Sequence, residues 1–174
     1  RSHVPGGVVF AEMGDRKAEL VAALKANRDE TIGALMRLTE LDLRRGRYEN
    51  GWNGLQILAH IAAIEWTYPR LLEVARMDQP TEASAAPAVR EARGGIDGYN
   101  ARQVERRAGM AATDLIAEWE RNREALIAAV EATTEESLAR PVRSAGGVTG
   151  DLSVVIRSVA IEHVRGHVAD LFTG

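Results

Sequence analysis

Three of the four histidines in this 174-residue chain have a spacing that suits metal binding. His163 and His167 are four residues apart in a segment of helical pattern, so both imidazoles project from one helix face. His60 lies one turn from Ile57 and one turn from Ile64, on the apolar side of another helical segment. All three imidazoles are therefore expected in the protein interior, which is an unfavourable place for unpaired titratable rings.

A divalent metal ion would satisfy these rings. Three neutral imidazoles are a stable set of nitrogen donors for a borderline ion such as Zn²⁺ or Ni²⁺. Three protein ligands leave a position for water or substrate, which is typical of catalytic metal sites. A bound cation lowers the pKa of a coordinated water to about 7 and deprotonates a coordinated thiol. We therefore predict that His60, His163 and His167 bind one divalent ion.

Two other interpretations explain the same residues. A pair of histidines four residues apart is more often core packing or surface chance than a metal site. The chain would then be a dimeric helical protein whose histidines are buried and hydrogen-bonded. Alternatively, it binds a metal or a small ligand and catalyses nothing, which the lack of an obvious general acid or base beside the three histidines favours.

Composition excludes several classes of function. The chain has no cysteine, which rules out disulfides, zinc ribbons, iron–sulfur clusters and a cysteine nucleophile. Any thiol chemistry would need a thiol carried by a small molecule. The net charge of −3 gives no electrostatic basis for binding nucleic acid. No apolar run approaches the roughly 18 residues of a membrane span, and there is no signal-peptide pattern, so we expect a cytoplasmic protein that binds no membrane.

The spacing of apolar residues predicts four helices, at about 15–39, 53–77, 99–132 and 151–171. Asn53 and Gln56 predict a capping box at the start of the second helix, and Pro69 predicts a kink within it. The irregular segment 78–98 is long enough for a crossover between the second and third helices. Residues 140–143 could be extended, but no sheet is expected. The predicted fold class is all-α, a four-helix bundle with this long crossover.

The domain organisation predicted from the sequence is simple. Residues 1–12 contain Pro5, Gly6 and Gly7 and have no helical period, so they are either a flexible arm or an artificial remnant, and His3 is set aside with them. Residues 13–174 form one domain, a size that buries a core without disulfides or structural metals.

Three short stretches of the sequence resemble the DinB-like superfamily, the four-helix-bundle metalloproteins that include the metal-binding domain of mycothiol-dependent maleylpyruvate isomerase. They are WNGLQILAHIAAIE at 52–65, IDGYN at 96–100 and EHVRGH at 162–167. The resemblance implies that His60, His163 and His167 are the ligands of one divalent metal, most simply zinc or nickel. It also implies a homodimer that acts on a small-molecule substrate. The implied activity is S-transfer with a low-molecular-weight thiol of the mycothiol or bacillithiol type.

Some neighbouring residues have two interpretations each. Glu65 lies about 140° around the helix from His60, so it should not bind the metal itself. It either contacts another helix or forms a hydrogen bond to one of the residues that bind the metal. Asp170, one turn beyond His167, either orients that imidazole or is a solvated helix end. Asn100 either caps the third helix or contacts substrate. The tryptophans are expected to be core or interface anchors rather than a cofactor site: Trp52, Trp66 and Trp119.

Overall fold

The computed structural model describes residues 16–46, 48, 51–77 and 94–173. The predicted arm at 1–12 and most of the predicted crossover, residues 78–93, lie outside these ranges. The described part of the chain is mostly helical, as the sequence predicted. The specific four-helix-bundle topology and the division into 1–12 and 13–174 stay predictions.

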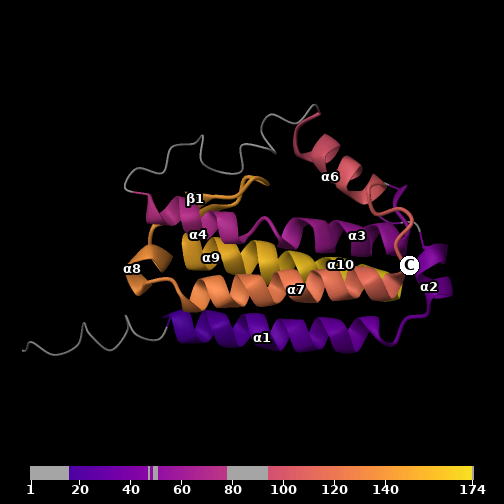
Figure 1. Cartoon of the computed structure of the whole chain (residues 1–174), viewed down its shortest axis with the longest axis horizontal. Helices are drawn as coiled ribbons and strands as arrows, with labels where there is room; N and C mark the ends of the chain where they lie inside the picture. The colour runs from indigo at the N-terminus through magenta and orange to yellow at the C-terminus, as the bar shows by residue number, and fades with distance from the viewer. Residues whose placement is uncertain (1–15, 47, 49–50, 78–93, 174) are drawn as a thin grey trace, which may run out of the picture.

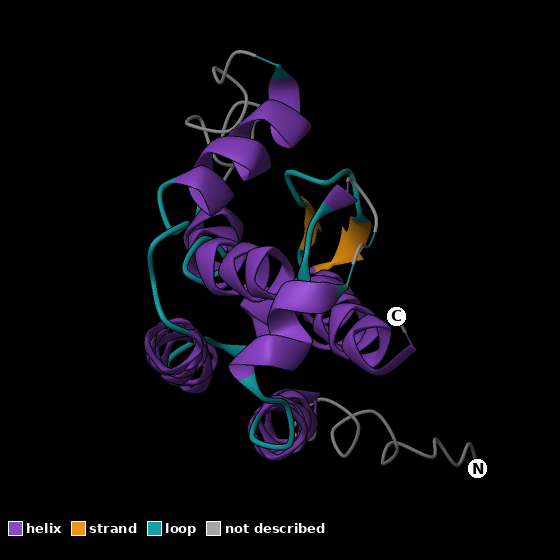
Figure 2. Cartoon of the chain, turned by 90° about the vertical axis from the view of Figure 1, so that its right-hand side faces the viewer, coloured by secondary structure: helices purple, strands orange, loops and turns teal. Residues whose placement is uncertain are grey.

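The longer helices lie side by side along the long axis of the molecule (Figure 1). They are α1 (Arg16–Leu35), α3 (Gly54–Glu65) followed by α4 (Pro69–Arg76), α7 (Ala112–Glu131), and an unbroken line of α9 (Leu152–Ile156), the π-helical segment η3 (Arg157–Glu162) and α10 (His163–Thr173). The described ranges contain three further helices: α2 (Glu40–Arg45), α6 (Gly95–Glu105) and α8 (Glu135–Leu138). Figure 2 looks at the end of this group and shows α6 standing to one side of it.

Two clusters of buried apolar side chains fill the space between the helices. One lies between α1, α4, α7 and the α9–η3 line, and it includes Leu24, Leu126 and Ile156. The other lies between α3, α7 and α10, and it includes Leu58 and Trp119. Burying each such side chain contributes roughly 1.5–3 kcal/mol, so these clusters hold the helices that carry the three histidines.

Several predicted helix boundaries are wrong, and the causes are local. The predicted first helix ends at Leu35, because Thr39 starts α2 with a capping box. The predicted second helix is divided into α3 and α4 at Pro69, where a kink was predicted. The predicted third helix is also two helices, since α6 ends at Glu105 and α7 begins at Ala112, with Gly109 between them.

The expectation that no sheet forms is also wrong. Strands β1 (Pro141–Arg143) and β2 (Thr149–Asp151) pair antiparallel, with Val142 opposite Gly150. The Ser144 hydroxyl accepts a hydrogen bond from the Val148 amide at 3.0 Å, and Gly147 supplies a positive φ of 88° in the turn. Strands of three residues are too short to show an alternating pattern in the sequence.

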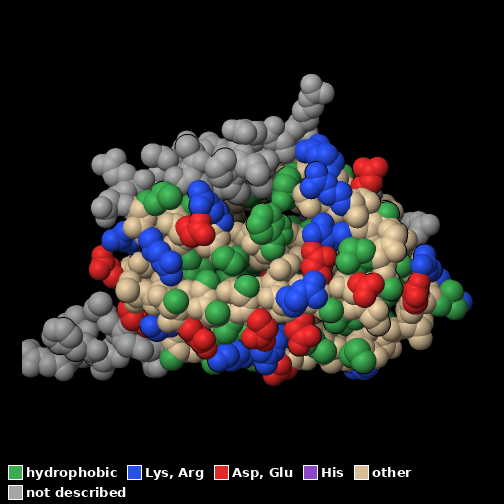
Figure 3. All heavy atoms as spheres, in the orientation of Figure 1, with side chains coloured by type: hydrophobic (Ala, Val, Ile, Leu, Met, Phe, Trp, Pro, Cys, Tyr) green, Lys and Arg blue, Asp and Glu red, His purple; other side chains and the backbone are tan. Residues whose placement is uncertain are grey.

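The surface carries charges of both signs. Figure 3 shows acidic and basic side chains mixed along the lower part of this face, over α1, with no large area of one sign. Among the described residues, no helix has both the length and the apolar character that a membrane crossing requires.

Candidate metal centre

The structure brings the three histidines together from two separate helices. His60 comes from α3 and is buried, whereas His163 and His167 come from α10 and are exposed and half-buried. One ring nitrogen of each lies within 4.8 Å of the others. The ring centroids are 5.7 Å apart for His60 and His163, 5.1 Å for His60 and His167, and 4.4 Å for His163 and His167.

The ring nitrogens fit a metal ion chemically. Nδ1 of His60 and Nε2 of His167 are buried and have no hydrogen-bond partner among the described residues. Buried polar atoms without partners are unusual and costly, so a missing ligand is the simplest explanation. Tetrahedral zinc with nitrogen ligands at about 2.1 Å places these donors about 3.4 Å apart. The observed spread of up to 4.8 Å is wider than this, so the rings would have to move closer together, through changes in their side-chain torsions, to share one ion.

Electrostatics keeps two of the rings in the form that binds metals. Burial, together with the smaller electrostatic effects of His167 and His163, lowers the pKa of His60 to about 3. Burial also lowers the pKa of His167, against the opposing effect of the Asp170 carboxylate. Both rings are therefore neutral at pH 7, and their lone pairs are available without the loss of a proton.

Local sequence sets the position of His60. The predicted capping box is present: the Asn53 side chain accepts from the Gln56 amide at 2.9 Å, and the Gln56 side chain accepts from the Asn53 amide at 2.9 Å. Gly54 packs directly against α2, where a Cβ would lie 2.8 Å from the Leu43 carbonyl oxygen. The start of α3 is thus fixed both by its own cap and by contact with α2.

The three histidines line a cavity of about 380 Å³. Its other walls are Trp52, whose ring centroid is 5.3 Å from that of His60, and Asp97, Asn100 and Ala101. Sequence reasoning placed Trp52 in a core or an interface and gave Asp97 no role. The spacing of Asp97 and Asn100, three residues apart on α6, is the signal that could have identified a polar face.

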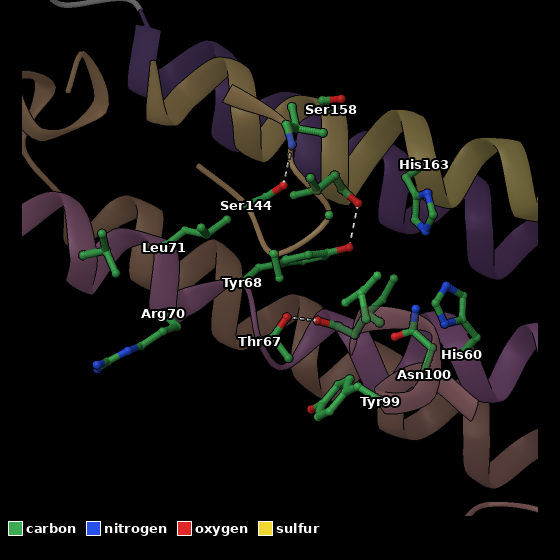
Figure 4. A pocket seen from close by; sticks show the side chains of 17 residues that line it. His60, Thr67, Tyr68, Arg70, Leu71, Tyr99, Asn100, Ser144, Ser158 and His163 are labelled. Atoms are coloured by element: carbon green, nitrogen blue, oxygen red, sulfur yellow. Dashed lines mark hydrogen bonds between the residues drawn. The ribbon is translucent and has the colours of Figure 1, made fainter. Parts of the chain in front are cut away.

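A second cavity of about 280 Å³ shares His60, Asn100 and His163 with the first. It is mostly apolar, with walls from α3, α4, α6, η3 and the β1–β2 turn (Figure 4): Ile64, Leu71, Val74, Ile96, Val148 and Val159. The hydroxyls of Thr67 and Tyr68 donate to backbone carbonyls. Oδ1 of Asn100 is buried and has no partner among the described residues, so it is available to accept a hydrogen bond from a ligand.

The remaining candidate residues lie in different environments. Glu65 is fully buried and pairs with Arg123 of α7, with Oε1 2.5 Å from Nε. Burial raises the pKa of Glu65, and the Arg123 charge opposes that rise. Asp170 is exposed and affects His167 through its charge, and no hydrogen bond joins the two in the described part of the chain.

Two of the predicted tryptophan anchors behave differently from each other. Trp119 is fully buried in the core, whereas the Trp66 side chain is 58% exposed. Arg123, which sequence reasoning missed, lies on the apolar stripe of α7 between Trp119 and Leu126. A charged residue on such a stripe signals a buried partner, although the stripe does not identify that partner.

Comparison with known proteins relates most of the chain to one family. The model of the DinB superfamily matches residues 23–170. Two crystal structures of mycothiol-dependent maleylpyruvate isomerase, one of them a histidine-to-alanine mutant, are similar to this chain with TM-scores of 0.70 and 0.69. Both are 16% identical to it, and each match covers 89% of this chain and 60% of the isomerase chain. At this identity the likeness concerns the fold. No curated protein matches the chain.

Proposed function

The chain belongs to the DinB superfamily, and from this premise we propose that it is a divalent-metal-dependent transferase that uses a low-molecular-weight thiol. One observation carries the proposal: three imidazoles meet with one nitrogen of each within 4.8 Å of the others, and two buried ring nitrogens, Nδ1 of His60 and Nε2 of His167, have no hydrogen-bond partner in the part of the chain that the structure describes. His60, His163 and His167 would hold the ion, for which zinc and nickel are the best candidates. The chain has no thiol of its own, so a thiol of the mycothiol or bacillithiol type would enter as cosubstrate.

The proposed reaction is nucleophilic substitution or addition by sulfur. A divalent ion held by the three histidines would supply the positive charge that keeps a thiol deprotonated at neutral pH. The thiolate sulfur would form the new carbon–sulfur bond. In a substitution the leaving group would depart with its bonding electrons and the thiol proton would pass to solvent, whereas in an addition the π electrons would move to the neighbouring atom, which would take up a proton. No atom changes its oxidation state through an external oxidant or reductant. The chain's own residues hold the site together, keep the imidazoles neutral and orient the electrophile.

The apolar cavity indicates the class of electrophile. At about 280 Å³ it is near the lower end of the range for small-molecule sites, so it suits a compact molecule. Its walls are apolar next to His60 and His163, and Asn100 offers one acceptor near them. We propose an electrophile with an apolar body and one N–H or O–H group, which binds in this cavity while the thiol approaches from the exposed side at His163.

Metal analysis tests the metal centre itself. Protein purified without an affinity tag is expected to contain about one divalent ion per chain, and His163→Ala is expected to lose it. His3→Ala is the matched control, because it removes the one histidine outside the proposed site. A wild-type protein with far less than one ion per chain would contradict the proposal.

Thiol consumption tests the activity. The metal-loaded protein is expected to accelerate conjugation of a low-molecular-weight thiol with a chloro-nitroaromatic, and His163→Ala is expected to abolish this acceleration.

The alternative is a non-catalytic protein that binds a metal or a small ligand. One observation favours this alternative: the described residues that line the apolar cavity include no carboxylate that could act as an acid or base. Loaded protein that is inert with several thiols would support it.

Two features of the assembly are proposals of the same kind. We propose that the fold is a four-helix bundle with a long crossover between the second and third predicted helices, and that two chains associate as a homodimer. Light scattering coupled to size-exclusion chromatography measures the second directly, since one chain has a mass of 18.9 kDa.

A further inference from the structure

A buried polar network connects the helix that carries His60 with the segment that precedes His163. It consists of the ion pair between Glu65 and Arg123, together with hydrogen bonds from Arg123 and Tyr68 to η3. We infer that Tyr68 and Arg123 are positioning residues for the metal centre, because they hold η3 in its π-helical form and so aim His163 and His167 at His60. This inference rests on the proposed function.

The π-helical form of η3 needs stabilisation from outside the helix. In a π-helix each amide bonds to the carbonyl five residues earlier, a rare geometry that occurs mainly as single turns at functional sites. Two consecutive carbonyls within η3 accept hydrogen bonds from side chains of other elements. The Val159 carbonyl accepts from the Tyr68 hydroxyl at 2.8 Å, and the Ala160 carbonyl accepts from Nη2 of Arg123. Figure 4 shows the Tyr68 hydroxyl directed at the line of helix that carries His163.

Arg123 is itself fixed from several sides. Its side chain is completely buried, and its guanidinium donates twice to the Glu65 carboxylate, at 2.5 and 3.2 Å. Nη1 donates to Oδ1 of Asn27 on α1 at 2.8 Å, and the guanidinium lies 4.8 Å from the ring centroid of Trp119. A planar group held in this way has little freedom to rotate, so its contact with Ala160 ties η3 to α1, α3 and α7.

The network lies close to the ligands along both helices. Glu65 follows His60 by five residues on α3, and Ala160 precedes His163 by three residues. If η3 changed to an α-helix, the register after it would shift by one residue, about 100° around the axis and 1.5 Å along it. His163 and His167 would then leave the positions in which their ring centroids are 5.7 and 5.1 Å from that of His60.

A buried ion pair of this kind could also serve only to stabilise the fold. The experiment must therefore distinguish general stabilisation from positioning of the metal ligands. Tyr68→Phe removes only the hydroxyl that donates to Val159. Tyr99→Phe is the matched control, because Tyr99 is also buried beside the same cavity but its hydroxyl makes no hydrogen bond to η3 in the described structure. Both variants and the wild type would be titrated with Zn²⁺ against a chromophoric chelator, and amide hydrogen exchange of residues 157–163 would be measured without metal.

The expected result is a loss of Zn²⁺ affinity of about 10-fold to 100-fold in Tyr68→Phe, the range found when groups that orient metal ligands are removed. The η3 amides of Tyr68→Phe should also exchange their hydrogens with solvent faster than those of the wild type. Tyr99→Phe should bind Zn²⁺ within about 2-fold of the wild type. Arg123→Lys is a second variant: it keeps the charge but cannot contact Glu65 and Ala160 together, and it should weaken binding in the same way.

The outcomes distinguish this inference from the proposed function. Equal Zn²⁺ affinities in Tyr68→Phe and Tyr99→Phe would overturn the positioning role while leaving the metal centre in place. A wild-type protein that does not bind Zn²⁺ or Ni²⁺ would overturn the proposed function, and the positioning role with it. Weaker binding in Tyr68→Phe together with unchanged exchange in η3 would also overturn the inference, because the hydroxyl would then act by another route.

Discussion

The metal-free protein is expected to lose stability in mild acid because of one ring, His60. Burial, with a smaller contribution from the neighbouring His167 and His163, lowers the pKa of His60 from 6.5 to about 3 in the folded protein. Below pH 6.5 His60 therefore becomes protonated in the unfolded chain but stays neutral in the folded chain. The free energy of unfolding falls as a result while the pH drops towards 3. Because pH 5 lies about 1.5 units below the ordinary pKa of histidine, this proton uptake costs the folded state about 2 kcal/mol of stability at pH 5. At pH 7.5 the cost is close to zero. Urea unfolding with a chelator present, at these two pH values, measures it.

His60→Leu isolates this contribution. The variant keeps the apolar surroundings but has no proton to take up, so its stability should change by about 2 kcal/mol less than that of the wild type between the two pH values. The lowered pKa of His167 acts in the same direction as that of His60, and the raised pKa of Glu65 acts in the opposite direction. Both groups are present in the wild type and the variant and cancel in the comparison. An identical pH dependence in the two proteins would refute the reasoning.

Three further outcomes are expected. Free Zn²⁺ at 100 times its dissociation constant should stabilise the wild type by about 2.7 kcal/mol, seen as a rise in Tm that a chelator reverses and that His163→Ala lacks. Glu65→Leu leaves the Arg123 charge buried without its partner, so calorimetry should show a loss of about 3–5 kcal/mol and a fall in Tm on the order of 10 °C. Gly54→Ala should destabilise the protein, because the added Cβ would meet the Leu43 backbone. Gly33→Ala places its Cβ in open space on α1, so urea unfolding should show that it stabilises the protein by roughly 0.5–1 kcal/mol.

The parts of the structure that follow from local chemistry were predictable from the sequence. Apolar periodicity located the helices, since a buried stripe repeats every three or four residues. The capping box of Asn53 and Gln56 was predictable because its partners are three residues apart. The meeting of His60 with His163 and His167 followed from inward-facing positions on two helices, although only the family resemblance related those helices to each other.

Features that depend on distant partners were not predictable. The pairing of Glu65 with Arg123 joins residues 58 positions apart, and no periodicity encodes such a pair. The sequence of η3 is that of an ordinary amphipathic helix. Its π-helical geometry comes from the hydrogen bonds that Tyr68 and Arg123 make to it, so the sequence of the segment alone does not predict it. The β1–β2 hairpin is too short to leave a pattern, and its turn depends on Gly147 and Ser144 acting together.

The π-helical turn also bears on how a centre of this kind arises and disappears in a lineage. A turn of this form accommodates one residue more than the α-helical turn it replaces. Deleting a single codon between 157 and 162 would let the whole line become α-helical with its histidines still on their present face, whereas straightening the turn at full length would rotate them by about 100°. Relatives without this extra residue are therefore expected to keep both imidazoles on the same face of the last helix, and an alignment with them needs a one-residue gap before the first of the two histidines.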